Sequence, residues 1–441
     1  MTPPPSSTPG VGESLREEWP ALDPDARAAA FQRLPASEAE EFFLGLSALG
    51  QAQILLRLPE RERRLWLRLL APDDVADVLQ EVEPADREGL LQLLDTVTRA
   101  EVRALLAYAE DDAGGLMSPR FARVRPDMSV EEAIRYLQRQ ARDRLETIYY
   151  AYVLDAGQRL LGVCSFRELF AASPSSPVRE VMEDDPVTID EDTDQEAVAR
   201  LFLRYGFLAL PVVDAEGRMK GIVTIDDIVD VLQEEATEDV QKYGGMQALD
   251  APYLQTGFGS MIRKRAGWLT LLFLGETLTA SAMGYFEDAL ARAVVLAVFL
   301  PLIVSSGGNS GSQASTLIVR AMALGEVKLR DVWLIARREF LAGATLGVIL
   351  AAVGALRVVL WQAVFGSYGE HAARIALTVG LSVVGVVTLG TLTGSMLPFL
   401  IRRCGWDPAS ASAPFVATVV DVGGVVIYFG VAQLILGGSL L

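Results

Sequence analysis

The stretch that most constrains the fold is residues 409–436, an apolar run that contains one carboxylate, Asp421. A helix that crosses a bilayer needs about 20 apolar residues, so this run is long enough to span. A carboxylate at membrane depth is costly and marks a functional site by default. Pro414 and the pair Gly423-Gly424 are expected to loosen the helix and to turn backbone carbonyls toward a cavity. Asp421 is therefore a candidate ligand for a divalent cation in a pore; a structural aspartate bonded to a neighbouring helix remains the alternative.

Charge is distributed very unevenly along the chain. The 441 residues carry 39 Lys and Arg and 57 Asp and Glu, of which 13 and 9 lie after residue 250. The first 250 residues therefore hold 26 and 48, a net charge of −22. An acidic first part disfavours nucleic acid and favours cations as partners. The single histidine, His371, argues against a zinc centre or a His-based catalytic triad, and no nucleophile–base pair or phosphate loop points to an enzyme.

Five apolar segments follow residue 250, at about 268–286, 294–323, 340–364, 375–401 and 409–436. Basic residues cluster before the first segment, between the second and third, and between the fourth and fifth. The positive-inside rule therefore places the soluble part in the cytoplasm and the C-terminus outside the cell membrane. Pro301 and the polar, glycine-rich residues 307–313 are expected to break the second segment and to line water, with Asn309 as a candidate pore residue. Close helix packing through small residues is the alternative.

The first part of the chain begins with a Pro/Ser/Thr-rich leader, residues 1–21, which we expect to be disordered. Residues 22–114 show apolar positions at helical spacing. Proline is tolerated in the first turn of a helix, so Pro35, Pro59, Pro72 and Pro84 are each expected to open a short helix. We therefore predict an all-α domain over 22–114.

An internal repeat covers residues 115–178 and 179–225. Residues 152–155 (Tyr-Val-Leu-Asp) are echoed by 211–214 (Pro-Val-Val-Asp), and each is followed by a Gly-Val or Gly-Ile pair. Each unit reads as an extended segment, helix, strand, turn, strand and helix. The two units resemble a tandem pair of CBS domains, with α/β folds.

The CBS resemblance implies a nucleotide cleft between the two units, with ATP as the candidate nucleotide. At matching positions Tyr150 and Phe207 offer faces for adenine stacking, Arg167 offers a phosphate contact, and Pro211 lines the cleft. Glu168 stands where such sites commonly carry an aspartate for the ribose. An empty, scaffolding cleft is the alternative, and the two readings stay open.

Residues 226–250 form an acidic segment with a narrow apolar side. Asp226 and Asp230, and likewise Glu234 and Glu238, are like-charged pairs four residues apart, which destabilise a helix by roughly 0.2–0.5 kcal/mol each. Bound divalent ions would remove that cost, whereas a solvated connecting helix is the alternative.

The order of these parts resembles the MgtE family of magnesium channels. The resemblance rests on residues 307–313 (Gly-Gly-Asn-Ser-Gly-Ser-Gln) and on 414–418 (Pro-Phe-Val-Ala-Thr) leading to Asp421, both behind a CBS pair. It implies a multidomain membrane protein: an all-α N domain, an α/β CBS pair, a connecting plug helix and a five-helix membrane domain, 251–441. It also implies a homodimer whose Mg²⁺ pore is lined by Asp421, the Ala417 backbone and Asn309.

The resemblance further implies a gate, in which cytosolic Mg²⁺ bridges the plug helix to the other cytosolic domains and closes the pore. Asp407 is expected as the partner on the membrane side, and the remaining candidates are acidic residues of the N domain, the second CBS unit and the plug helix. These are Asp73, Asp77, Asp194, Glu196, Asp226, Asp227, Asp230, Glu235, Glu238 and Asp239. Closure would be a population shift driven by stronger binding to the closed state.

Two other functions remain open. The first is a cation-coupled Mg²⁺ exchanger that uses Asp421, with Glu276 as a proton or sodium site. The second is a membrane-anchored CBS nucleotide sensor whose membrane part only docks a partner.

Overall fold

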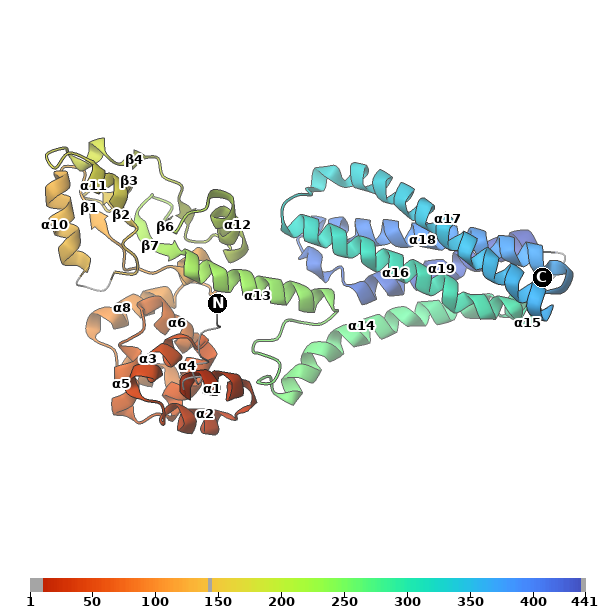
Figure 1. Cartoon of the computed structure of the whole chain (residues 1–441), viewed down its shortest axis with the longest axis horizontal. Coiled ribbons are helices and arrows are strands. Elements are labelled where there is room, and N and C mark those ends of the chain that lie inside the picture. Colours follow the sequence, from red (N-terminus) through yellow and green to blue (C-terminus); the bar gives the residue numbers. More distant parts are fainter. Residues whose placement is uncertain (1–10, 142–144, 438–441) are drawn as a thin grey trace, which may run out of the picture. The chain divides into compact units, whose positions relative to one another are not determined.

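The computed structural model describes residues 11–141 and 145–437. The chain divides into two compact units, Met1–Glu235 and Ala236–Leu441 (Figure 1). The two units have separate hydrophobic cores. The boundary falls within one helix, α13 (Ile225–Tyr243).

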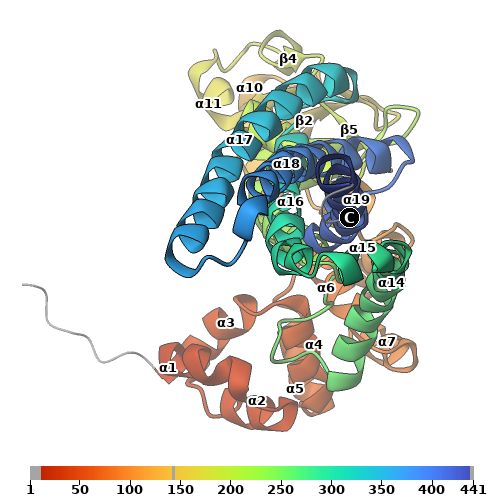
Figure 2. The same ribbon diagram turned by 90° about the vertical axis from the view of Figure 1, so that its right-hand side faces the viewer.

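The first unit begins with a helical domain, as predicted. Short helices follow one another with connections of a few residues (Figure 2), and all four prolines mark helix starts: Pro72 and Pro84 occupy the first turns of α6 and α7, while Pro35 and Pro59 immediately precede α3 and α5. The helices are α1 (Val11–Glu18), α2 (Pro24–Phe31), α3 (Ala36–Leu44), α4 (Ala48–Arg57), α5 (Glu60–Leu67), α6 (Pro72–Gln80), α7 (Pro84–Leu91) and α8 (Thr96–Leu105), with a 3₁₀ turn at Trp19–Ala21.

The expected leader is shorter than the sequence analysis placed it. Residues 11–21 form α1 and the 3₁₀ turn, and Leu15 and Trp19 are buried in the domain core. The Trp19 ring lies edge-on to Phe42 with centroids 4.9 Å apart. These two apolar side chains tether a segment whose composition is otherwise polar. Residues 1–10 lie outside the described part of the chain.

The internal repeat is visible as two sheets that share the arrangement of their first three strands; the first sheet has a fourth strand at its edge. The first has the strand order β1 (Arg123–Val124), β2 (Tyr150–Leu154), β3 (Leu160–Ser165), β4 (Glu183–Asp184), and the second β5 (Ile189–Asp190), β6 (Ala209–Val213), β7 (Met219–Thr224). In each, the first pair is parallel and the next is antiparallel. The β2–β3 register shifts at Val153/Leu154 and the β6–β7 register at Val212/Val213, which are equivalent positions of the repeat.

The same turn closes both hairpins. Asp155 Oδ1 accepts hydrogen bonds from the backbone of Gly157 and Arg159, and Asp214 Oδ1 accepts them from Glu216 and Arg218. The helices of this part are α9 (Ala113–Leu116), α10 (Val130–Gln140), α11 (Phe166–Ala171) and α12 (Gln195–Tyr205), with a 3₁₀ turn at Val178–Glu180. The two predicted α/β units are therefore confirmed.

The second unit is helical. Its elements after α13 are α14 (Phe258–Tyr285), α15 (Glu287–Arg292), α16 (Val295–Ala323), α17 (Val332–Phe365), α18 (Ala372–Arg403) and α19 (Ala413–Leu436), with 3₁₀ turns at Leu329–Asp331, Gly369–His371 and Pro408–Ser410. In the described part of the chain, four helices are long and apolar enough to cross a membrane: α16, α17, α18 and α19. α14 is not among them, and Glu276 lies in its middle. The fifth span therefore stays a prediction.

The expected break in α16 is not observed, because α16 is one continuous helix through Pro301 and residues 307–313. Its glycines serve close packing instead. A Cβ on Gly390 would overlap the Gly307 carbonyl oxygen, and a Cβ on Gly394 would overlap that of Gly311. Two Gly-x₃-Gly patterns thus bring the backbones of α16 and α18 into contact, as in small-residue packing between membrane helices. The alternative reading of residues 307–313 was the correct one.

The expected loosening of α19 is also absent. Pro414 sits in the first turn, where a missing N–H costs nothing, and Ser412 caps the helix by accepting the Phe415 N–H at 3.4 Å. Gly423 and Gly424 accommodate neighbours: Cβ atoms there would lie 2.5 Å from Leu389 and 3.3 Å from Val386. Because Ala417 lies inside this regular helix, its carbonyl belongs to the helical hydrogen-bond ladder rather than to an open cavity.

Candidate functional site

An acidic cluster forms inside the first unit, where α6 meets the start of α13. Asp73 interacts electrostatically with Asp227 and Glu146, and Asp74 with Asp226. We call this the α6–α13 cluster; its members are Asp73, Asp74, Asp77, Glu110, Glu146, Asp226, Asp227 and Glu234. Helical segments about 150 residues apart in sequence thus place carboxylates against one another.

Burial and mutual repulsion both act on these carboxylates. Asp73 is only 7% exposed, and burial, followed by the charges of Glu146 and Asp227, holds its pKa well above the ordinary value of 3.8. Burial raises the pKa of Asp227 to about 7, although Thr224 Oγ1 donates to its Oδ2 at 2.6 Å and opposes the shift. The pKa of Asp77 moves in the same direction, but its side chain keeps contact with water, which screens it. The cluster therefore favours a bound positive charge.

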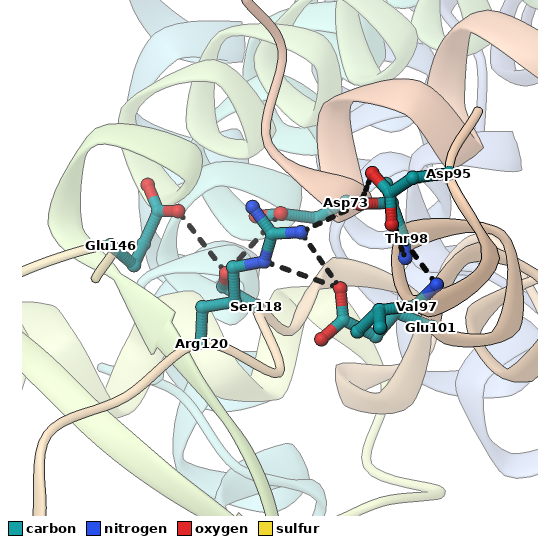
Figure 3. Close-up of polar contacts among 8 residues, drawn as sticks. All are labelled: Asp73, Asp95, Val97, Thr98, Glu101, Ser118, Arg120 and Glu146. Atoms are coloured by element: carbon teal, nitrogen blue, oxygen red, sulfur yellow. Dashed lines mark hydrogen bonds and ion pairs between the residues drawn. The ribbon is translucent and has the colours of Figure 1, made fainter. Parts of the chain in front are cut away.

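One serine serves two of these carboxylates. Ser118 Oγ lies 3.2 Å from Asp73 Oδ1 and 3.1 Å from Glu146 Oε2 (Figure 3). A hydroxyl has one proton to donate, so only one carboxylate can accept it at a time. Nearby, Arg120 is held by Glu101 at 2.9 Å and by Thr98 Oγ1 at 2.9 Å, so its charge is already paired (Figure 3). Asp73 and Glu146 therefore compete for the single proton of Ser118.

The donor set of the cluster fits a hard divalent cation. Carboxylate oxygens are the ligands that Mg²⁺ prefers, and Mg²⁺ keeps several of its waters. Among the described residues, no group of three or more Asp, Glu, His or Cys side chains is arranged to hold one ion directly. The carboxylates here could therefore hold a hydrated ion in pairs, rather than enclose a bare one.

The candidate gating residues separate into groups. Asp73, Asp77, Asp226 and Asp227 meet in the α6–α13 cluster, and Asp230 acts on Glu234 at its edge. Asp194 instead caps α12 by accepting the Glu196 N–H at 3.0 Å, and Glu196 pairs with Arg200 at 2.7 Å. Glu235 accepts from Gln195 Nε2 at 2.7 Å, and Asp239 is a half-buried residue of α13.

Sequence reasoning missed four members of the cluster. Asp74 and Glu234 lie in the same acidic stretches as the candidates Asp73 and Asp230, so their positions in the sequence could have identified them. Glu110 and Glu146 carry no such signal, because they reach the cluster only through the tertiary fold. 

In the second unit, Glu238 and Asp407 both form an ion pair with the same lysine. Lys242 Nζ donates to Asp407 Oδ2 at 2.8 Å and also pairs with Glu238, one turn earlier on α13. These two candidate metal ligands are thus already joined by a side-chain cation.

Asp421, the candidate pore residue, faces a second carboxyl group. Its side chain is within hydrogen-bonding reach of Glu276 on α14. The contact follows from close packing, since a Cβ on Gly275 would lie 2.6 Å from the methyl of Thr418. Ala417 packs beside Gly308, and Asn309 is an exposed residue of α16.

The candidate nucleotide residues lie around the contact between the two repeat units. Tyr150 packs against a small core that joins Tyr152 of β2 to Ala209 and Ile222 of the second repeat unit. Tyr150 is opposite Ser165 in the β2–β3 ladder, and Arg167 follows two residues later, exposed on α11.

The remaining candidate nucleotide residues already make contacts with other residues of the domain. Phe207 stacks on Tyr205 with centroids 5.6 Å apart, and Pro211 is buried in β6. Glu168 Oε2 accepts from the backbone N–H and the hydroxyl of Ser165, both at 2.8 Å. This capping box at the start of α11 competes with a ribose for the Glu168 carboxylate.

Comparison with known proteins gives a consistent set of relatives. Residues 13–111 match the MgtE intracellular N domain, residues 113–175 and 178–234 match CBS domains, and residues 300–431 match MgtE, described as a divalent cation transporter. The magnesium transporter MgtE of Thermus thermophilus is 43% identical over 427 residues, which cover 96% of this chain and 93% of that protein. The magnesium transporter MgtE of Enterococcus faecalis is 33% identical and covers 96% of this chain and 98% of that protein.

A solved structure, the cytosolic domain of the Mg²⁺ channel MgtE in complex with ATP, is 48% identical; the match covers 50% of this chain and 90% of that chain, with a TM-score of 0.47. The two relatives that match nearly the whole chain are both named magnesium transporters. The helical domain, the paired α/β units and the apolar helices occur here in the order in which the family descriptions match. With 43% identity along nearly its whole length, this chain belongs to the MgtE family of magnesium transporters.

Proposed function

We propose that this chain forms a homodimeric, multi-pass membrane channel for Mg²⁺ that cytosolic Mg²⁺ closes. Asp421 on α19 meets the permeating ion, and the α6–α13 cluster is the sensor. The helical domain and the CBS pair lie in the cytoplasm and the C-terminus lies outside, as the basic loops indicate.

The main support for the proposed gate is that Asp73 is buried and is repelled by the charges of Glu146 and Asp227. These three carboxylates come from separate parts of the fold and repel one another, and two of them, Asp73 and Glu146, share one serine hydroxyl. A divalent cation bound among them removes the repulsion and stabilises the arrangement in which α6 and α13 are in contact. An arrangement that binds Mg²⁺ more tightly is populated more as Mg²⁺ rises, which gives closure by population shift.

The pore assignment rests on Asp421, a carboxylate inside a helix that is long and apolar enough to span. Few protein oxygens suffice for an ion that keeps its waters, and loose coordination lets the ion leave. Pairing Asp421 across a two-fold axis doubles the negative charge that one chain supplies, which is why we propose the dimer.

ATP is proposed as a modulator at the CBS pair. The relative solved with ATP is 48% identical to this chain over the cytosolic part. Tyr150, Arg167 and Phe207 offer ring faces and a guanidinium near the contact between the repeat units. 

A coupled exchanger is the second candidate, because Glu276 places a second carboxyl group beside Asp421. Mg²⁺ flux that follows an imposed proton gradient at constant Mg²⁺ gradient would favour the exchanger, whereas indifference to that gradient favours the channel.

The test is Mg²⁺ flux into proteoliposomes, with Mg²⁺ on the cytosolic side set low and then high. Asp421→Asn is expected to abolish flux, whereas the combined variant Asp73→Asn with Asp227→Asn is expected to keep flux but lose its inhibition by Mg²⁺. Asp184→Asn, on the exposed strand β4 of the first sheet, is the matched control and should behave as wild type. Normal flux in Asp421→Asn would refute the pore, and normal inhibition in the combined variant would refute the sensor.

A further inference from the structure

Within the second unit, a lysine joins the last turn of α13 to the segment that precedes α19. Lys242 Nζ donates to Asp407 Oδ2 at 2.8 Å, and its ammonium also pairs with Glu238 one turn back on the same helix. The lysine side chain is only 29% exposed, and that of Asp407 37%. An ammonium carries three donors, so Lys242 can serve both carboxylates at once.

Asp407 sits at the start of the pore helix. Its other oxygen, Oδ1, accepts the Ala409 N–H at 2.8 Å and so caps the 3₁₀ turn Pro408–Ser410 that leads into α19. The Ala411 carbonyl, just beyond, accepts from Ser315 Oγ of α16 at 2.9 Å. A displacement of Asp407 is therefore expected to move the segment that positions the first turn of α19.

Two further contacts fix the same end of α13. Tyr243 OH hydrogen-bonds to the Ser312 carbonyl at 2.7 Å and to Thr316 Oγ1 at 2.6 Å, both on α16. Gly245 has a φ of +74°, and a Cβ there would lie 2.8 Å from Trp268. Trp268 Nε1 in turn donates to Ser412 Oγ at 3.2 Å, the residue that caps α19. The end of α13 is thus seated against α14, α16 and the start of α19.

We propose that Lys242 is a built-in cation that takes the place of a gating metal between Glu238 and Asp407 and latches the end of α13 to the start of α19. The latch works without Mg²⁺, so Glu238 and Asp407 are not metal ligands and Mg²⁺ is sensed in the α6–α13 cluster alone. A second cation at the same carboxylates would be repelled by the ammonium.

This inference rests on the proposed gate and gives separate roles to the latch and to the sensor, the α6–α13 cluster. The latch sets how far the pore is closed when Mg²⁺ is absent. The sensor then adds the Mg²⁺-dependent part. Both contributions favour the same closed state, so weakening the latch raises the Mg²⁺ concentration needed for closure.

The test compares wild type and Lys242→Met in proteoliposome Mg²⁺ flux over a series of cytosolic Mg²⁺ concentrations. We expect flux at the lowest concentration to rise about two- to fivefold, the range of a partly exposed ion-pair network, and the half-inhibitory Mg²⁺ concentration to rise by a similar factor. The steepness of inhibition should stay the same, because no metal site is lost. A metal site at Glu238 and Asp407 predicts the reverse: removing the competing ammonium would lower the half-inhibitory concentration, and that result would overturn the latch.

Two further variants separate the latch from a folding defect. Lys242→Asp combined with Asp407→Lys keeps an ion pair with reversed charges, and we expect it to recover most of the wild-type inhibition, whereas either single change should not. Lys328→Met, in the loop that precedes α17, is the control for loss of a lysine in the same unit.

The outcomes also distinguish the latch from the gate. A wild type that Mg²⁺ does not inhibit would refute the proposed gate. Normal inhibition in wild type, together with unchanged basal flux and unchanged half-inhibition in Lys242→Met, would refute the latch alone.

Discussion

Asp73 Oδ1 lies 3.2 Å from the hydroxyl of Ser118, 45 residues away in sequence, and this hydroxyl donates a hydrogen bond to a carboxylate that is only 7% exposed. Ser118→Ala removes this donor from Asp73 and from Glu146 together. We expect the cytosolic part to lose about 1–3 kcal/mol of stability without Mg²⁺, the cost of leaving a buried polar group unsatisfied. Thermal unfolding of the full protein in detergent measures this loss, and Ser173→Ala, at an exposed position, is the control.

The stability of the cytosolic part should fall as pH rises when Mg²⁺ is absent. The pKa of Asp227 is raised from 3.8 to about 7 and that of Asp73 is raised as well, so the folded state holds protons that the unfolded chain releases. This stabilising contribution is complete below about pH 4 and is lost as pH rises through about 7. The protection factors of the α6 amides, which correct for the intrinsic rise of exchange with pH, should therefore be lower at pH 8.5 than at pH 6, and Mg²⁺ should raise them more at pH 8.5. Equal protection factors at both pH values would contradict the cluster's electrostatics.

Glu276 is expected to contribute to ion affinity beside Asp421. Replacing it with glutamine removes one of two neighbouring carboxyl groups, and we expect the Mg²⁺ concentration that gives half-maximal flux to rise about tenfold, or ~1.4 kcal/mol. Glu339→Gln, on α17, is the matched control for a glutamate in the membrane unit. Flux saturation that is the same in both variants would mean that Glu276 does not act on the ion.

Arg167 is expected to carry the phosphate end of a bound nucleotide. Its guanidinium is exposed on α11, and a charge-assisted hydrogen bond contributes about 1.5–3 kcal/mol. Arg167→Ala should therefore weaken ATP binding at least about tenfold in titration calorimetry. Arg135→Ala, an exposed arginine that pairs with Glu131 on α10, should bind ATP as wild type does. Equal affinities would remove Arg167 from the nucleotide site.

Gly390→Ala is expected to be strongly destabilising. The new methyl group would overlap the Gly307 carbonyl, and α16 and α18 would have to separate, at a cost of about 1–3 kcal/mol or more. Gly380→Ala on the same helix is the control, because a Cβ there would lie 3.7 Å from Ala351, an ordinary contact. Thermal unfolding in detergent should show a lowered midpoint for the first variant only.

Much of the fold was predictable because its signals are local. Pro72 and Pro84 open helices by the chemistry of one residue, and the repeated motif at residues 152–155 and 211–214 fixes equivalent strands and bulges. The leader was misjudged at Leu15 and Trp19, since two buried apolar side chains outweigh a polar composition.

The sites that were wrongly predicted depend on contacts with residues elsewhere in the chain, which one stretch of sequence does not reveal. Residues 307–313 were expected to line water, yet Gly307 and Gly311 match the spacing of Gly390 and Gly394, a pattern that could have been noticed. Lys242 stands four residues after Glu238, so half of the latch was visible as an i,i+4 pair, whereas Asp407 was not. The meeting of Glu146 with Asp73 had no signal in the sequence at all.

The glycine contact between α16 and α18 has a mechanical consequence. With backbone against backbone at two successive turns, these helices have no side chains between them that could repack to let one slide along the other. They are therefore expected to move as one rigid body. Any widening of the conduction path would then come from tilting of α19 or α14 against that fixed pair, and the hinge for such a tilt would lie at the segment before Ser412.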